Sequence, residues 1–556
     1  MGGGTVSGEV EAVRRRAAEL AAQLAPAARR SATIAQERAI LRMLGVDGLD
    51  RAGRPLAASM AERYCSPDSD RLARGIILPF AVALLEYDLP ARDLGLEVAS
   101  GAIDLGLEAE LLDRPERLAA AEAHARRLLA AALARFDANK TASRDMRDVL
   151  GLADEPWLGV SLHAAEVAPA AEETKALVAA GADVVQVRVP ASWEFAEARR
   201  NAGLETPGLF EAETPTGKAG KGAGGRAAGR LPGRGRGARG TAAQSQRLEG
   251  ELVPAGSQRG LAALRRAADE AAAERGCYAS LMTVTSAFAA PEQAVVAAFE
   301  RIDFVEADPI REIVEDNVDP ARALADHAFA HWLQARAGCR VLIGPGPLAL
   351  GADVASGVPS DAATRAGRAL ALQALGVELA LADGLTAERL LLGAVPDWVA
   401  GDGDSQSILV QTWLRSLVFP GHRLMIGEAL ADTPPGARTS ALVTALVGAA
   451  ASLVVRNGAG VSVTEAGADL GAAASAAAAL RSALGDRTLH GTAAALAIRT
   501  LNAASETLDS LAGEGWGSLL GPAGRGNEAE RLGGGAVVER ASGPTSGARL
   551  LAVLKL

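Results

Sequence analysis

Several polar residues that could bind a charged ligand share one property: each stands just after a short apolar run. They are His163, Arg188, Thr283, Thr285, Ser286, Glu306, Asp308, Asp383, Glu428, Arg456 and Asn457, together with the Gly344-Pro345-Gly346 turn. Guanidinium and hydroxyl groups suit a phosphate, and carboxylates suit an ammonium group. If the apolar runs are neighbouring parallel strands, these groups gather at one edge, and we predict a polar ligand-binding rim there.

Some of these residues also have a simpler structural interpretation. Glu306 and Asp308 are two positions apart, so on a strand they would share a face. They could form an acid pair at the rim or be ordinary polar residues at a strand end. Asp383 and Ser286 could bind a ligand or cap the helix that follows.

Eight apolar runs would have to position these residues. They are Trp157–Leu162, Asp183–Val187, Tyr278–Val284, Asp303–Glu306, Arg340–Ile343, Val377–Leu381, Arg423–Ile426 and Ser452–Val455. Runs that are apolar throughout are typical of strands covered on both faces. Ala-rich helical patterns separate them, for example over Ala170–Ala180, Ser257–Glu274 and Asp361–Leu375. The alternation predicts an α/β fold, a (β/α)₈ TIM barrel, with a doubly wound sheet as the alternative.

The rest of the chain divides around this barrel, which we place at residues 151–485. Residues 1–150 read as an all-helical accessory region, with a link near Asn139–Pro156. In it, Thr33 or Ser31 can cap a helix that Gly45 ends. Residues 486–556 are predicted to hold C-terminal helices and a Gly-rich tail with a closing strand at Arg549–Lys555.

Composition excludes several classes of protein. The net charge of −10 argues against general nucleic-acid binding. The three cysteines are far apart in the sequence, which predicts no disulfide framework and fits a reducing cytoplasm. The N-terminus does not read as a signal peptide, and no segment reads as a membrane span.

Residues 207–254 form a basic Gly/Arg-rich insert that interrupts the barrel after its second strand. Such a composition cannot bury a core, so we expect disorder. It could bind RNA or a phosphate-rich partner, or it could be a solvated loop insertion.

Common cofactor motifs are absent from the sequence. There is no GxGxxG fingerprint, Walker A loop, GxSxG elbow or cobalamin-binding DxHxxG pattern. His327 and His331 have a spacing that could bind a metal, but no HExxH glutamate accompanies them, and we predict no metal site. No lysine stands at the end of a predicted strand, so a cofactor bound through a lysine requires another chain. The five lysines are Lys140, Lys175, Lys218, Lys221 and Lys555.

Three segments carry a resemblance to a known family. They are Gln36–Gly48 (QERAILRMLGVDG), Gly181–Val185 leading to Arg188, and Arg415–Pro420 (RSLVFP). With the tail around Gly533–Arg540, their order and spacing along about 500 residues resemble the large (alpha) subunit of D-lysine 5,6-aminomutase and the related D-ornithine 4,5-aminomutase.

This resemblance implies a cytoplasmic enzyme that uses adenosylcobalamin and pyridoxal phosphate in a radical 1,2-shift of a terminal amino group. It also implies a smaller beta subunit that brings the cobalamin-binding domain and the lysine that binds pyridoxal phosphate. Arg188 and Ser286 match family residues that contact the cofactor, and Ser192 falls within one residue of a further family serine. Glu306, Asp308 and Glu428, with Asp383, are then the candidate catalytic residues that would bind the substrate's ammonium groups.

The match is incomplete at other rim positions. Arg311 stands where the family has a tyrosine, and Asp316 where it has an arginine. The Gly344–Pro347 turn replaces an acidic residue, and Met425 lies where the family has a lysine, with Arg423 the nearest cation. The leading hypothesis is an aminomutase large subunit acting on a lysine- or ornithine-like amino acid. The alternative is a degenerate barrel that acts as a scaffold or regulatory subunit.

Overall fold

The computed structural model describes residues 6–66, 68–162, 164, 166–188, 257–344, 361–394, 405–428, 435–448, 451–456, 462–484, 492–516 and 537–541. The side chains of some residues at the ends of elements, including Arg188 and Glu428, lie outside the description. The insert at 207–254 and the predicted closing strand at 549–555 also lie outside it.

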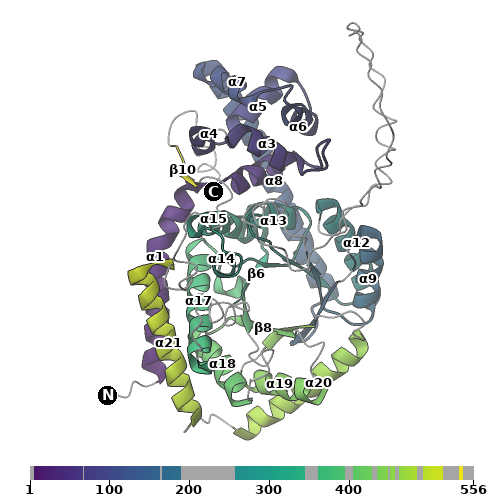
Figure 1. The fold of residues 1–556 in the computed structure, drawn as a ribbon. Helices are drawn as coiled ribbons and strands as arrows, with labels where there is room; N and C mark the ends of the chain where they lie inside the picture. The colour runs from purple at the N-terminus through teal and green to yellow at the C-terminus, as the bar shows by residue number, and fades with distance from the viewer. Residues whose placement is uncertain are drawn as a thin grey trace, which may run out of the picture.

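Eight parallel strands close into a barrel in chain order, which confirms the predicted fold class. They are β2 (Trp157–Ser161), β3 (Val184–Arg188), β4 (Ser280–Val284), β5 (Phe304–Glu306), β6 (Arg340–Ile343), β7 (Leu390–Ala394), β8 (Arg423–Glu428) and β9 (Ala451–Arg456). The last strand, β9, pairs with β2 and closes the barrel. Figure 1 shows the strands arranged in a ring, with helices outside them.

Alternating side chains divide each strand between two cores. One core fills the barrel and comprises Trp157, Val184, Met282, Phe304, Leu342, Leu391, Met425, Leu453 and Val455. The intervening residues, such as Val185, Leu281 and Val305, pack outward beneath the helices. Burial on both faces is the reason that the strands read as continuous apolar runs.

Ten helices follow or flank the strands among the described residues. They are α9 (Val167–Ala179), α12 (Gln258–Arg275), α13 (Ala290–Phe299), α14 (Pro309–Val314), α15 (Pro320–Ala337), α17 (Ala362–Ala382), α18 (Ser405–Val418), α19 (Pro435–Gly448), α20 (Val463–Leu484) and α21 (Thr492–Glu514). The C-terminal α21 packs closely on α17. At Gly367 of α17 the helices are so close that a Cβ would overlap the Thr500 carbonyl oxygen.

One predicted strand is wrong. Val377–Leu381 belongs to α17, and the sixth strand of the barrel is β7, Leu390–Ala394. Alanine and leucine favour a helix, and the buried residues run from Ala369 to Val377 and return at Leu379 and Ala380. Position 376 inside this helix is a glycine because a Cβ there would come within 2.9 Å of Ile343 Cγ2.

The N-terminal part of the chain is helical, with one short strand. Its elements are α1 (Val6–Arg30), β1 (Ser31–Ala32), α2 (Ile34–Met43), α3 (Leu56–Cys65), α4 (Ser69–Arg74), α5 (Ile77–Tyr87), α6 (Ala91–Ser100), α7 (Leu105–Ala109), the 3₁₀ turn Glu110–Asp113 and α8 (Pro115–Leu150). The predicted cap is confirmed, because Thr33 accepts a hydrogen bond from Gln36 N at 3.2 Å. The first part of the predicted link Asn139–Pro156 is wrong, because α8 continues as a helix to Leu150.

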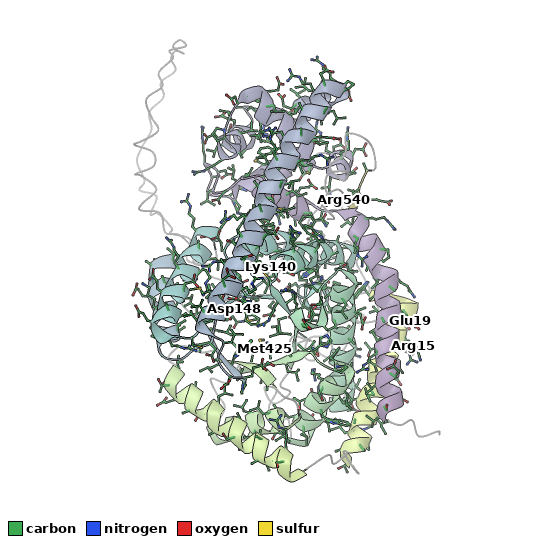
Figure 2. All side chains as sticks on the ribbon, turned by 180° about the vertical axis from the view of Figure 1, so that it is seen from behind. Arg15, Glu19, Lys140, Asp148, Met425 and Arg540 are labelled. Carbon is green, nitrogen blue, oxygen red and sulfur yellow. The ribbon has the colours of Figure 1, made fainter. Side chains whose placement is uncertain are left out.

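Two different surfaces of the barrel hold these N-terminal helices. α1 lies along α17 and α21, whereas α2–α7 form a cap over α13 and α15 (Figure 1). β1 pairs with β10 (Val538–Glu539), which joins the two ends of the chain. Figure 2 shows α8 running from this cap past the barrel, with Lys140 and Asp148 on its lower half and Arg540 at the cap.

Candidate functional site

The strand register brings the predicted rim residues of three neighbouring strands to one level. Arg188 of β3 pairs with Val284 of β4, and Val284 pairs with Glu306 of β5. On the other side of the barrel, Glu428 of β8 pairs with Arg456 of β9. Because parallel strands are about 4.8 Å apart, the Arg188 and Glu306 backbones are separated by about 10 Å. Both are last residues of their strands, at the face where barrel enzymes place their chemistry.

The loop that follows β4, residues Thr285–Ala289, is tied to the next strand. Thr285 donates to the Glu306 carbonyl oxygen twice, from its backbone N–H at 2.9 Å and from its hydroxyl at 2.7 Å. Ser286, the predicted cofactor ligand, follows directly, and its carbonyl oxygen accepts from Ala289 N at 3.1 Å. We call this segment the β4 loop, and its anchoring fixes where Ser286 lies.

Arg311, on α14, joins the ends of β4 and β5. Its guanidinium donates to the Glu306 carboxylate at 3.2 Å and to the Thr285 carbonyl oxygen at 2.8 Å. Glu306 is therefore partly neutralised within the chain. The sequence places Arg311 at a rim position but does not indicate this ion pair, because i and i+5 contacts here depend on the turn from β5 into α14.

Asp308 follows β5 but turns its carboxylate toward α14. Its Oδ1 accepts from Ile310 N at 2.9 Å, so it is the N-cap of that helix. Its Oδ2 has no hydrogen-bond partner among the described residues. Burial, opposed by the Arg311 charge, raises the pKa of Asp308 to about 7. Glu306 and Asp308 therefore serve different local contacts, and a direct role for either with a substrate stays a prediction.

Two further carboxyl groups surround Arg311. Burial raises the pKa of Glu312 to about 8, and His327 Nε2 lies 3.0 Å from its Oε1. Glu315 lies at the surface, yet the chain around it and the nearby acidic groups raise its pKa to about 8 as well. The side of the rim after β5 is thus acidic and holds protons near neutral pH. A bound ammonium group would favour the ionised forms and lower these pKa values.

We expect Asp308→Asn to flatten the pH dependence of stability. A carboxyl whose pKa is higher in the folded chain than in the unfolded chain binds its proton more tightly when folded. Its contribution is fully present at about pH 4 and is lost as the pH rises through about 7. Asparagine keeps the capping oxygen without the charge, so the variant should be about 1 kcal/mol more stable than the parent chain at pH 8 and no more stable at pH 4. Thermal unfolding between pH 4 and 9 measures this difference, and parallel curves for the two chains would contradict it.

A buried ionic cluster holds the β4 loop from the N-terminal cap. Arg38 of α2 is 2% exposed; its Nε donates to Glu292 of α13 at 2.9 Å, and its Nη2 donates to the Phe288 carbonyl oxygen. Arg42 donates to the same Glu292 at 2.7 Å. Burial alone would raise the pKa of Glu292, but these two guanidiniums hold it below its ordinary value. On the other side, the Phe288 N–H binds the Glu312 carboxylate.

This cluster explains the QERAILRMLGVDG segment. Two of its charged residues, Arg38 and Arg42, form with Glu292 an anchor for the loop that carries Ser286, whereas Glu37 pairs with Arg540. The i, i+4 spacing of Arg38 and Arg42 indicates one helix face. Nothing in the sequence indicates that this face meets Glu292, some 250 positions later.

Other predicted rim residues lie elsewhere or outside the description. The predicted rim position of Asp383 is wrong. Asp383 ends α17 at the amino-terminal face of the barrel, where it contacts His331 Nδ1 at 3.1 Å and Arg29 Nε at 3.2 Å. The rim prediction fails because the strand predicted before Asp383, Val377–Leu381, belongs to α17. His163, Ser192, Asn457 and the turn beyond Gly344 lie outside the described residues.

His327 and His331 lie one turn apart on α15, both buried. His327 contacts Glu312, and His331 contacts Asp383. In the described ranges, no group of three or more metal-ligating side chains is present. Nor does any helix in them combine the length and apolar character that a membrane crossing requires.

Comparison with known proteins gives one family. The model of the D-lysine 5,6-aminomutase TIM-barrel domain of the alpha subunit matches residues 6–192 and 254–402. The lysine 5,6-aminomutase alpha subunit of Fusobacterium nucleatum is 23% identical over 416 residues, which cover 74% of this chain and 69% of the relative. The matched ranges include the N-terminal cap as well as β2 through β7.

Solved structures with a similar fold include dihydropteroate synthases. The one from Anaplasma phagocytophilum, with bound 6-hydroxymethylpterin-monophosphate, is 13% identical with a TM-score of 0.33; the match covers 58% of this chain and 98% of that one. The one from Yersinia pestis is 14% identical with a TM-score of 0.31, covering 60% and 94%. Likeness at this level carries no functional inference.

Proposed function

The chain belongs to the family of the D-lysine 5,6-aminomutase alpha-subunit TIM barrel, and from this premise we propose that it is the large subunit of an adenosylcobalamin- and pyridoxal-phosphate-dependent aminomutase. The proposed reaction is a radical 1,2-shift of an amino group on a lysine- or ornithine-like amino acid, an isomerisation. The observation that carries the proposal is the family match, which extends over more than half of the chain.

The distribution of charge around the rim fits this pair of ligands. Arg188 ends β3 and Ser286 lies in the β4 loop, whereas the described carboxylates gather at and after the end of β5. A phosphate therefore fits the first side and a substrate ammonium group the second. We assign Arg188, Ser192 and Ser286 to the cofactor phosphate or ring oxygen. Glu306, Asp308 and Glu428 are assigned to the substrate.

When bound, adenosylcobalamin supplies the radical that removes a substrate hydrogen atom, and pyridoxal phosphate carries the migrating amino group. The residues of this chain would bind and orient these groups. The barrel mouth would also keep water from them.

The lysine that binds pyridoxal phosphate is assigned to a smaller beta subunit, which would also bring the cobalamin-binding domain. This fits the lysines that the structure describes. Lys175 pairs with Glu270 at 2.8 Å on the outside of the barrel. Lys140 lies on α8, at the amino-terminal face of the barrel. Neither is at the rim. The active species would then be a cytoplasmic hetero-oligomer that takes part in lysine or ornithine degradation.

One feature favours a second candidate, a barrel that no longer turns over and instead scaffolds or regulates its partner. Arg311 stands where the resemblance places an aromatic residue, and it already pairs with Glu306. A guanidinium held by a carboxylate and the Thr285 carbonyl cannot stack on a cofactor ring without losing those contacts.

Reconstitution separates the two candidates. The chain would be purified together with its candidate small subunit, and the complex scanned for the absorbance of bound pyridoxal phosphate. D-lysine or D-ornithine would then be added and the cob(II)alamin radical signal recorded. A complex that binds cofactor and gives the radical supports the aminomutase. A complex without cofactor supports the scaffold, and no complex at all contradicts both.

A further inference from the structure

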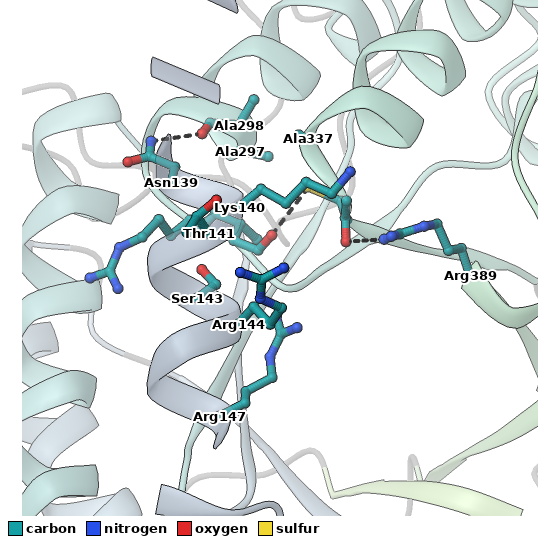
Figure 3. Close-up of a pocket in the computed structure, with 14 residues that line it drawn as sticks. Asn139, Lys140, Thr141, Ser143, Arg144, Arg147, Ala297, Ala298, Ala337 and Arg389 are labelled. Carbon is teal, nitrogen blue, oxygen red and sulfur yellow. Dashed lines mark hydrogen bonds between the residues drawn. The ribbon is translucent and has the colours of Figure 1, made fainter. Parts of the chain in front are cut away.

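Two adjoining cavities open at the amino-terminal end of the barrel, opposite the rim. The larger is about 430 Å³, and its charged lining consists of Arg147, Arg340, Arg389 and Arg423 with the carboxylates Asp303 and Glu388. The smaller, about 210 Å³, shares Arg147, Gly338 and Arg389 with it and adds residues of α8. In Figure 3, Lys140 and Arg147 of α8 face the smaller cavity from one side and Arg389 from the other.

The positive charge of the larger cavity is only partly balanced by the described carboxylates. Asp303 is 5% exposed and already accepts from Arg147 at 2.5 Å, Arg265 at 3.0 Å and the Tyr278 hydroxyl at 2.8 Å. Asp303 is thus shared between Arg147 and Arg265, and Arg265 has a second partner in Asp269 at 2.6 Å. Glu388 is exposed to solvent and screens little.

Arg340 is the least compensated of these cations. No carboxylate of the described residues lies within ion-pair distance of it, and its guanidinium instead stands 5.3 Å from the ring centres of both Trp157 and Phe304. Arg423 stands 5.2 Å from the same Trp157 ring and also pairs with the Glu155 carboxylate at 3.2 Å. Partial burial and the charges of Arg423 and Arg147 lower the pKa of Arg340 to about 10. Arg340, held against the indole without a carboxylate of the described residues, favours a ligand of opposite charge.

The aromatic rings make this arrangement rigid. Trp157 and Phe304 belong to the core inside the barrel, and their rings meet edge to face at 6.0 Å. Arg340 and Arg423 are the first residues of β6 and β8, so their Cα positions are fixed by the sheet. A guanidinium that is positioned in advance loses little freedom when it binds an anion bidentately.

We infer that the cavity lined by Arg147, Arg340, Arg389 and Arg423 binds a small phosphate-bearing molecule. A phosphate group matches the guanidinium fork and can accept from several arginines at once. The volume exceeds that of one phosphate, so a diphosphate or a small organic phosphate fits. Catalysis in barrels of this kind takes place at the opposite face, so the ligand here acts on stability or regulation and not on the bond-breaking step.

The test is a titration of the full-length chain with inorganic pyrophosphate at constant ionic strength, followed by calorimetry and thermal unfolding. Glycerol 3-phosphate in a parallel titration distinguishes an organic phosphate from an inorganic one. We expect saturable binding of one ligand per chain and a higher Tm. Arg340→Met should weaken binding at least tenfold. The control is Arg336→Met, which removes an exposed arginine of α15 that pairs with Asp137 and should leave binding unchanged.

Arg340→Met has a second expected effect that guards against a simple loss of folding. Methionine keeps a contact with Trp157 and Phe304 and removes an uncompensated cation. Without ligand, the variant should therefore unfold about 2 °C higher than the parent chain. A lower Tm would contradict the proposed charge imbalance.

Arg188→Ala separates this cavity from the rim, where a cofactor phosphate is also proposed to bind. Pyrophosphate binding that is lost in Arg188→Ala but intact in Arg340→Met would overturn the inference. The inference would also be overturned if chloride at equal ionic strength abolished pyrophosphate binding. These results leave the proposed aminomutase function unaffected, since that depends on the opposite face.

Discussion

Arg188→Ala should weaken the binding of pyridoxal phosphate to the reconstituted complex by about 10- to 100-fold. A hydrogen bond between charged groups contributes about 1.5–3 kcal/mol, and the alanine variant leaves the phosphate without its cation on the β3 side. The register holds Arg188 beside Val284, directly before the β4 loop that carries Ser286. Equilibrium dialysis, or titration of the cofactor absorbance, measures the change.

The matched controls for this prediction lie on the same chain. Arg336→Ala removes an exposed arginine of α15 and should leave cofactor affinity unchanged. Arg188→Lys keeps a positive charge without the bidentate geometry, so its affinity should fall between those of the parent chain and the alanine variant. If all three variants bind the cofactor equally well, the phosphate is held by other residues and the assignment of Arg188 is wrong.

The sequence predicts the barrel well because strands buried on both faces leave short runs that are apolar throughout. Seven of the eight predicted runs coincide with strands of the structure. The failure at Val377–Leu381 has a local cause. The segment is equally apolar in a buried helix, and periodicity cannot separate the two states over five residues. The strand that was missed, Leu390–Ala394, is short, leucine-rich and without β-branched residues.

The candidate site is less predictable than the fold. Strand ends can be read from the sequence, so Arg188, Glu306 and Glu428 fall at the carboxyl ends of β3, β5 and β8. What each side chain contacts depends on turns and long-range packing. Asp308 caps a helix in place of sharing a strand face with Glu306, and the pairing of Arg311 with Glu306 follows from that turn.

The second large effect is expected for Arg38→Met, which should destabilise the folded chain by about 3 kcal/mol. The substitution leaves the Phe288 carbonyl oxygen without the Arg38 donor and removes one of two cations from the buried Glu292. Breaking one partner of a buried ion pair is strongly destabilising because the remaining charge stays in a poorly solvated place. Thermal unfolding measures the loss, and Arg336→Met, which breaks an exposed pair, should change stability by less than about 1 kcal/mol.

A double-mutant cycle decides whether the cluster or the arginine alone is responsible. Glu292→Gln by itself leaves Arg38 and Arg42 facing each other without a carboxylate, so it should also be destabilising. If the pair acts as a unit, the Arg38→Met/Glu292→Gln variant will lose about 1–3 kcal/mol less than the sum of the two single losses. Because Arg38 contacts the β4 loop, both single variants should weaken cofactor binding as well, although neither residue is at the rim. Additive losses with unchanged cofactor affinity would show that the N-terminal cap stabilises the chain without positioning Ser286.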